Sequence, residues 1–110
     1  MLTWEEFEKV EMRVGTIIEV NDFPEARKSA YQLTIDFGAE IGVRKSSAQI
    51  TKRYTKDELV NRQIVAVVNF PKKQIGKFMS ECLVLGSVGA DNDIVLLAPD
   101  VKVENGLRIG

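Results

Sequence analysis

The sequence predicts a mainly β protein, built as a small closed barrel of five strands with short helices inserted. Residues 31–37 alternate between apolar and polar side chains without a fault, which indicates a strand with one buried face. Residues 64–68 form a continuous apolar run of strand length. The longest connection, between the predicted third and fourth strands, carries helix signals. A chain of 110 residues fits one domain with one hydrophobic core.

Residues 1–10 are predicted to form a short N-terminal helix. Thr3 and Glu6 make a capping box, in which each side chain accepts from the backbone N–H of the other residue. The helix is too short to be stable alone, so it must dock against another surface. That surface is either the chain's own core or a second subunit. We expect a homodimer contact through the apolar stripe of Leu2, Trp4, Phe7 and Val10.

Three strands are predicted after this helix. Met12 to Val20 is rich in β-branched residues, and Gly15 predicts a bend or bulge within it. Tyr31 to Phe37 is the alternating strand. Ile41 to Lys45 is the third strand, reached through a short turn. The connection that follows contains two predicted helical segments, one over Ala48 to Tyr54 with Ser47 as its cap and one started by the capping box Thr55 to Glu58.

The remaining strands complete the barrel. Ile64 to Val68 is the apolar fourth strand, and a basic turn or loop helix is predicted over Lys72 to Phe78. Glu81 to Ser87 and Ile94 to Ala98 are two more strands, followed by an extended piece with an Asn105-Gly106 turn. Five strands with a helix between the third and the fourth are typical of an OB-fold, so we expect one OB-fold domain over residues 1–110.

Positive charge is concentrated in the middle of the chain. Residues 43–80 hold nine Lys and Arg against two acids, a net charge of +7, whereas residues 1–42 carry −5 and residues 81–110 carry −3. The total of −1 therefore conceals a basic centre that can attract phosphates. A merely solvated basic rim is the simpler interpretation. We favour a nucleic-acid surface, because Ser, Asn and aromatic residues are interleaved with the cations.

Groups for catalysis and metal binding are scarce. The chain has no histidine, and its single cysteine, Cys82, lies in an apolar run typical of a buried thiol. Acids such as Asp91 and Asp93 are interpreted as turn residues. We therefore expect no enzyme activity, no metal and no cofactor. No apolar stretch approaches the ~20 residues needed to span a bilayer, so we expect no membrane insertion. We expect a cytoplasmic protein, because the chain has one cysteine and its acidic N-terminus is unlike a signal peptide.

Two clusters supply the candidate binding residues, and both combine cations for phosphates with small polar side chains for hydrogen bonds. The candidate RNA contacts are Arg44, Lys45, Ser46, Ser47, Lys52, Arg53, Asn69, Lys72, Lys73, Lys77 and Ser80. We expect the seven cations of this set to converge on one face of the barrel. The candidate peptide contacts, which are alternatively core residues, are Phe70, Pro71, Phe78 and Met79.

The same clusters resemble the signatures of the CsaA family, small bacterial and archaeal proteins described as export-related chaperones. Residues 40–54 are similar to its central signature, and residues 67–71, 75–76 and 80–81 are similar to its second one. The resemblance covers essentially the whole chain. It implies a non-enzymatic chaperone that binds unfolded preproteins.

CsaA proteins are in turn similar to the tRNA-binding domains appended to some aminoacyl-tRNA synthetases. That wider family implies an OB-fold, recognition of the tRNA body by shape, and homodimers among its free-standing members. Asn69, Ser80 and Glu81 match its motif. Cys82 and Leu83 stand where the motif has a Gly-Met pair, so no RNA contact is carried over to these two positions.

Three functions are left open by the sequence. They are a chaperone for unfolded preproteins, a free-standing protein that binds tRNA or tRNA-like RNA, and a structural dimeric domain of a larger complex. Salt dependence separates the first two, because counterion release makes RNA binding collapse as salt rises, whereas apolar peptide capture changes little.

Overall fold

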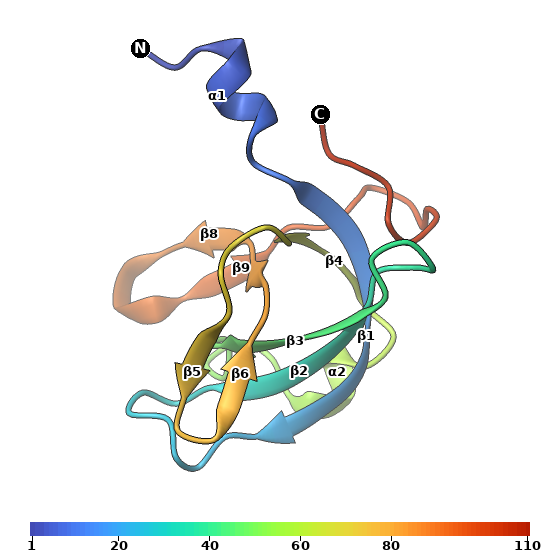
Figure 1. Cartoon of the computed structure of the whole chain (residues 1–110). Coiled ribbons are helices and arrows are strands. Elements are labelled where there is room, and N and C mark those ends of the chain that lie inside the picture. Colours follow the sequence, from blue (N-terminus) through green and yellow to red (C-terminus); the bar gives the residue numbers. More distant parts are fainter.

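The computed structural model describes all of residues 1–110 and contains a five-stranded antiparallel sheet that curls into a nearly closed barrel (Figure 1). Its strands are ordered β3-β2-β1-β4-β7. Two separate hairpins, β5–β6 and β8–β9, extend from the barrel. The predicted fold class, a mainly β barrel of the OB type with short helices, is confirmed. The strands are β1 (Met12–Asp22), β2 (Tyr31–Asp36), β3 (Val43–Ala48), β4 (Gln63–Val67), β5 (Lys73–Ile75), β6 (Phe78–Ser80), β7 (Leu83–Val84), β8 (Gly86–Val88) and β9 (Ile94–Leu96).

The core fills the barrel with mainly aliphatic side chains. The alternating strand β2 points Leu33 and Ile35 inward, and both are fully buried. The apolar strand β4 is buried over Ile64 to Val67, as its unbroken apolar run predicts. Twelve buried residues form one contiguous cluster: Ile17, Leu33, Ile35, Phe37, Ala48, Ile50, Tyr54, Leu59, Ile64, Ala66, Val68 and Cys82.

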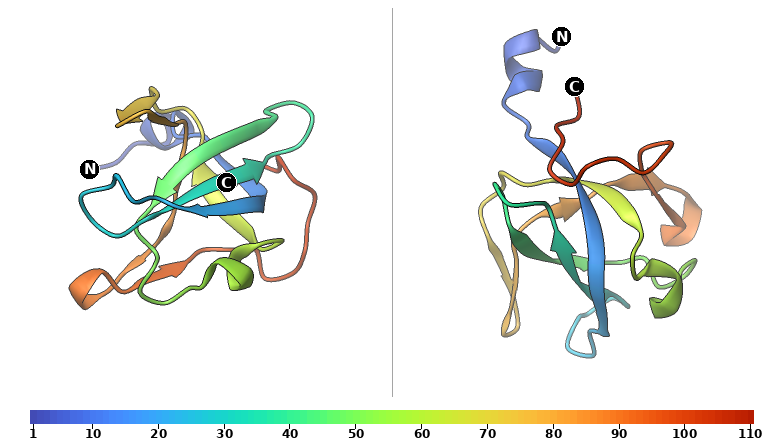
Figure 2. Two further views of the ribbon diagram at one scale, coloured as in Figure 1. Left: turned by 90° about the horizontal axis from the view of Figure 1, so that it is seen from below. Right: turned by 90° about the vertical axis from the view of Figure 1, so that its right-hand side faces the viewer.

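Both predicted capping boxes are present. Thr3 and Glu6 cap α1 (Trp4–Glu8), and Thr55 and Glu58 cap α2 (Lys56–Leu59) between β3 and β4. A single turn of 3-10 helix, η1 (Ala90–Asn92), connects β8 to β9. Helix α1 buries none of its residues and stands off the barrel beside the C-terminus (Figures 1 and 2). None of these helices has the length and apolarity needed to cross a membrane.

The predicted helix over Ala48 to Tyr54 is wrong, and so is the loop-helix alternative for Lys72 to Phe78. Residues up to Ala48 remain in β3, because Ala48 pairs with Tyr31 in the β2–β3 ladder, and a turn rather than a helix follows over residues 51–53. The segment from Lys72 to Phe78 is not a loop helix but most of the β5–β6 hairpin. Gly76 adopts a φ of 60° at the tip of that hairpin, a left-handed conformation that glycine reaches without a steric penalty.

Gly15 has a different role from the predicted bulge. The register of β1 against β2 shifts between Ile17 and Glu19 instead. A Cβ on Gly15 would lie 2.7 Å from side-chain atoms of both Ile35 and Phe37. Glycine is therefore required here by the close approach of core side chains, which the sequence pattern does not distinguish from a bulge.

Candidate nucleic-acid interface

The barrel is closed between β3 and β6–β7 mainly by side chains. Only one backbone hydrogen bond crosses this seam, from Glu81 N–H to the Lys45 carbonyl at 2.7 Å. The Glu81 carboxylate accepts from Lys45 N–H at 3.0 Å, and Ser80 Oγ accepts from Ser47 N–H at 3.2 Å. These side chains take the place of strand carbonyls and satisfy edge groups of β3. The seam is thus held at Lys45 and Ser47.

Beyond this closure the seam widens into a groove of about 490 Å³. One wall is formed by the end of β3 and the residues that follow it, including Ser47 and Gln49. The other wall is formed by β5–β6 and β7–β8. Nine of the fifteen lining residues are hydrophobic, and none is aromatic. The groove therefore offers aliphatic side chains and strand-edge backbone, but no ring on which a nucleic-acid base can stack.

Four of the predicted cations lie along the β3–β5–β6 side of the seam. Lys73 lines the groove, and Lys72 Nζ lies 3.5 Å from Glu81 Oε2. Lys45 is exposed on β3, and Lys77 is exposed at the tip of the hairpin. These four cations are separated by up to 32 positions in the chain. That all seven predicted cations share one face stays a prediction.

Arg44 is placed differently from its neighbours. Its guanidinium donates to the Val68 carbonyl at 3.1 Å, and the residue is half-buried. It therefore contributes charge to this end of the barrel while its side chain is held by the end of β4.

Lys52 and Arg53 both bond to residues of the 91–93 turn. Arg53 makes two hydrogen bonds to the Asp93 carboxylate, from Nε at 2.9 Å and from Nη2 at 2.7 Å. Lys52 Nζ donates to the Asp91 carbonyl at 3.3 Å. The contact lowers the pKa of the Asp93 carboxyl and raises the pKa of Arg53, in both cases first through the side-chain hydrogen bond. These two cations are not free in the structure.

Three small polar candidates are occupied by structural hydrogen bonds. Ser46 is 1% exposed and donates to the Cys82 carbonyl at 2.9 Å, so its prediction as an RNA contact is wrong. Ser80 accepts from Ser47 N–H, as described above. Asn69 accepts from Glu11 N–H at 3.0 Å and donates to the Lys9 carbonyl at 2.6 Å, which ties the segment after α1 to the end of β4.

The candidate peptide residues divide into exposed and packed side chains. Phe70 is 55% exposed and Met79 is 40% exposed, and Pro71 is exposed beside them. Phe78 instead packs on Phe23, with ring centroids 5.2 Å apart. A small apolar hollow of about 250 Å³ lies at Phe70 and Pro71 and shares the residues Lys73, Ser80, Cys82 and Leu83 with the groove.

The candidate dimer residues are largely uncovered in the single chain. Trp4 is 84% exposed and Leu2 is 73% exposed, whereas Val10 is 39% exposed and Phe7 is partly covered. Leu2, Trp4 and Phe7 line a shallow hollow next to Gly110. The alternative in which the helix packs on its own core is wrong, because α1 buries no residue.

Cys82 is a core residue, as its apolar surroundings predict. It is 6% exposed, and desolvation raises the pKa of its thiol to about 12. The thiol is therefore protonated near neutral pH and unsuited to act as a nucleophile.

Comparison with known proteins identifies the family of this chain. A family model described as "Putative tRNA binding domain" matches residues 12–108. The solved structure of the CsaA chaperone from Picrophilus torridus is 55% identical and covers 100% of both chains with a TM-score of 0.93. That of the CsaA chaperone from Bacillus anthracis is 49% identical, covers 100% of this chain and 99% of the other, and has a TM-score of 0.94. The chain is a CsaA-like member of the tRNA-binding domain family.

This tRNA-binding domain also occurs within longer relatives. The methionine–tRNA ligase of Thermococcus onnurineus is 38% identical over 106 residues, which are 96% of this chain and 14% of the ligase. The chain thus spans only a small fraction of the length of such curated relatives. The family it shares with them is a tRNA-binding domain family and not a catalytic one.

The contacts of this tRNA-binding domain that the sequence does not reveal lie at the 91–93 turn and at the seam. Asp93 was interpreted as a turn residue, and it is one, but it also pairs with Arg53 forty positions away. Asn92 Nδ2 donates to Gln49 Oε1 at 2.9 Å. Glu81 was noted only as a motif match, yet its carboxylate holds the seam. No local sequence signal reports these contacts, because each joins distant segments.

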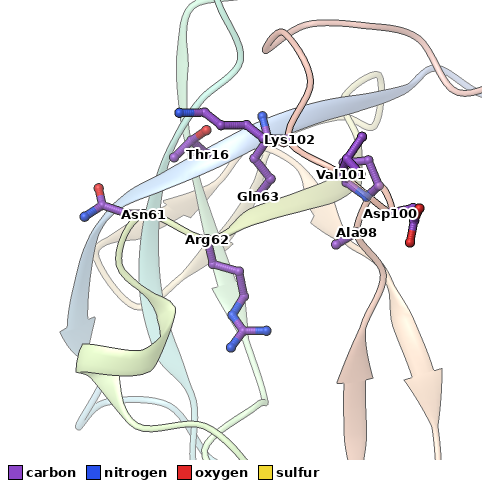
Figure 3. A pocket seen from close by; sticks show the side chains of 9 residues that line it. Thr16, Asn61, Arg62, Gln63, Ala98, Asp100, Val101 and Lys102 are labelled. Atoms are coloured by element: carbon purple, nitrogen blue, oxygen red, sulfur yellow. The ribbon is translucent and has the colours of Figure 1, made fainter.

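A further hollow on the tRNA-binding domain, of about 420 Å³, lies between residues 61–63 and residues 98–102. Figure 3 shows the Arg62 and Lys102 side chains extending in different directions there. Arg62 lies over the Tyr54 ring, 5.1 Å from its centroid. Gln63 Nε2 already donates to the Val103 carbonyl at 2.7 Å. The polar groups do not converge, so we assign no ligand to this hollow.

Proposed function

We propose that this chain is an RNA-binding protein without enzymatic activity that recognises the body of tRNA or of a tRNA-like RNA. The observation that carries the proposal is the row of exposed cations on β3 and the β5–β6 hairpin, Lys45, Lys72, Lys73 and Lys77. These side chains come from segments distant in the chain. Lys73 lines the groove, and Lys72 lies beside Glu81 at the seam. Membership of the tRNA-binding domain family supports the same partner.

The chemistry of the surface favours recognition of the RNA backbone over reading of its bases. Lysine is a flexible point charge that suits phosphate oxygens. The groove lining contains no aromatic residue, so successive bases have no stacking platform within it. Binding to phosphates along a folded RNA depends on the shape of that RNA rather than on its sequence.

A salt titration of binding tests this proposal. Changing both Lys72 and Lys73 to Gln should weaken tRNA binding and reduce the slope of log K against log salt by roughly 0.7–0.9 for each phosphate that the variant no longer neutralises. A matched control changes Lys9 and Lys102 to Gln, which removes the same charge outside the hairpin. Equal effects of the two double variants, or a wild-type affinity that does not depend on salt, would contradict the proposal.

A second function is supported by the apolar surface beside the cations. We propose that the chain also holds unfolded preproteins for export, as a chaperone of the CsaA type. Phe70, Met79 and Leu83 are each at least 40% exposed, and they lie at the hollow or on the hairpin that borders the groove. The two similar solved structures are described as chaperones.

Suppression of aggregation tests the chaperone activity. Changing Phe70 and Met79 to Ser should reduce the ability of the protein to keep an unfolded preprotein soluble, because the variant offers less apolar surface to the client. The lysine double variant serves as the matched control and should retain this activity at high salt. Loss of activity on raising salt alone would show that the effect is electrostatic and would exclude apolar capture.

Assembly and cellular setting complete the proposal. We infer that the protein is a homodimer whose interface uses Leu2, Trp4, Phe7 and Val10, because α1 leaves this stripe uncovered. We further propose a cytoplasmic location, where a single free thiol such as Cys82 stays reduced.

A further inference from the structure

The turn between β8 and β9 closes one end of the groove through three contacts. Asp93 pairs with Arg53, the Asp91 carbonyl accepts from Lys52, and Asn92 bonds to Gln49. The segment from Lys45 to Arg53 therefore bonds to two different parts of the chain. Lys45 and Ser47 bond to the seam residues Glu81 and Ser80, whereas Lys52 and Arg53 bond to this turn. The turn lies against the same groove, because Asn92 and Gln49 both line it.

The Arg53–Asp93 pair has the geometry with which arginine binds a phosphate. Two parallel N–H groups of the guanidinium fork, Nε and Nη2, reach the two oxygens of one carboxylate at 2.9 and 2.7 Å. Phosphate oxygens accept from the same fork in the same two-point manner. While the pair is intact, the Nε and Nη2 donors of Arg53 are occupied by the Asp93 carboxylate.

The turn that carries Asp93 is a tight hairpin turn tied to the segment after β3. Asp91 and Asn92 both have left-handed backbones, with φ of 56° and 62°, and the Asp93 N–H donates to the Ala90 carbonyl at 3.2 Å. Two consecutive left-handed residues are the geometry of a type I′ turn, which Asp and Asn favour. The bonds to Gln49 and Lys52 join this turn to the end of the groove and position Asp93 at the guanidinium.

We propose that Asp93 is a specificity-determining residue of the RNA surface, because its carboxylate competes with phosphate for the Nε and Nη2 donors of Arg53. A folded RNA that is already held by Lys45, Lys72, Lys73 and Lys77 presents its next phosphate to Arg53 at high effective concentration and outcompetes the carboxylate. A short single strand lacks that anchoring and competes less well. This inference rests on the proposed RNA binding and adds how the same surface discriminates between RNAs.

The test compares tRNA with a short unstructured oligonucleotide on four proteins: wild type, Asp93→Asn, Arg53→Gln and the double variant. Asp93→Asn should raise affinity for the oligonucleotide several-fold, steepen its salt slope by roughly 0.7, and change tRNA affinity less, so that selectivity falls. Arg53→Gln should weaken tRNA binding. The double variant should lose the gain that Asp93→Asn produces. Asp100→Asn, an exposed acid elsewhere, is the matched charge control.

A gain from Asp93→Asn no larger than that from Asp100→Asn, or a gain that survives in the double variant, overturns the inference. Asn92→Ala loosens the turn but keeps the carboxylate, and a full gain from it would assign the effect to turn position instead of charge. If wild-type protein shows no salt-dependent tRNA binding, the proposed function itself fails. Circular dichroism and thermal melting confirm that each variant remains folded.

Discussion

Asn69 shows how one side chain can match a binding motif and yet be used by the fold. Its amide oxygen and nitrogen are both engaged, with Glu11 N–H and the Lys9 carbonyl. Arg108 adds a bond to the Glu8 carbonyl at 2.7 Å. Together these bonds orient the N-terminal segment relative to β4. Any effect of Asn69 on RNA binding is therefore expected to be indirect.

Replacing Asn69 with Ala should weaken association of the subunits while leaving the salt slope of tRNA binding unchanged. The reason is that α1 loses two of its anchors, each contributing about 0.5–1.5 kcal/mol, whereas no cation is removed. Sedimentation at several protein concentrations measures the first effect, and a salt titration measures the second. A reduced salt slope with intact association would show that Asn69 acts at the RNA surface instead.

Cys82 should be unreactive toward thiol reagents in the native protein at pH 8. Burial raises its pKa to about 12, so the reactive thiolate is scarce below that pH, and reactivity should increase only as pH rises toward the raised value or as the chain opens. Labelling rates measured across urea concentrations should follow the unfolding transition. Rapid labelling of folded protein would contradict the burial of this thiol.

At the scale of elements, α1 is the helix that leaves its apolar stripe largely uncovered. Its capping box makes it begin at a defined residue, but a helix of 5 residues is too short to be stable alone. The exposed Trp4 and Leu2 are therefore the residues that we propose for the subunit contact.

Changing Trp4 and Phe7 to Ala should convert the proposed dimer to monomer. Burial of each ring at a subunit interface contributes on the order of 1.5–3 kcal/mol, which the truncated side chains cannot supply. Analytical ultracentrifugation reports the oligomeric state, and circular dichroism reports whether the barrel survives. A Glu5→Gln variant, on the same helix but outside the apolar stripe, should behave as wild type. A dimer that persists without both rings would assign the interface to another face.

At the scale of the whole molecule, closure of the barrel depends on Glu81. One backbone bond, two side-chain acceptors and the Ser46 hydroxyl, which donates to the Cys82 carbonyl, join β3 to the β6–β7 segment, and Glu81 supplies the backbone bond and one acceptor. The same seam opens into the groove, so a change at Glu81 is expected to affect both stability and the proposed binding.

Replacing Glu81 with Ala should destabilise the fold by about 0.5–1.5 kcal/mol, because the exposed Lys45 N–H exchanges its carboxylate acceptor for water. Glu81→Gln keeps an acceptor oxygen and should destabilise less, while removing the negative charge beside Lys72 should strengthen tRNA binding. Urea denaturation and binding titrations separate the two effects. Equal stability of both variants would show that the seam does not rely on this hydrogen bond.

Much of this molecule follows from local sequence. The alternation of residues 31–37, the apolar run at 64–68 and the two capping boxes each depend on side chains within a few positions, and each was predicted correctly. The burial of Cys82 follows in the same way from its apolar neighbours. Charge segregation likewise needs only the composition of each third of the chain.

Only the tertiary structure decided how those parts are used. Lys72 to Phe78 became a hairpin because Lys73 and Ser80 pair across it, and Ala48 stayed in a strand because Tyr31 lies opposite. The basic residues separated into a set on β3 and the hairpin, in which Lys72 pairs with Glu81, and a set bonded to the 91–93 turn, since Arg53 meets an acid forty positions away. Propensity and charge are properties of a segment, whereas availability for a ligand depends on which distant segment folds against it.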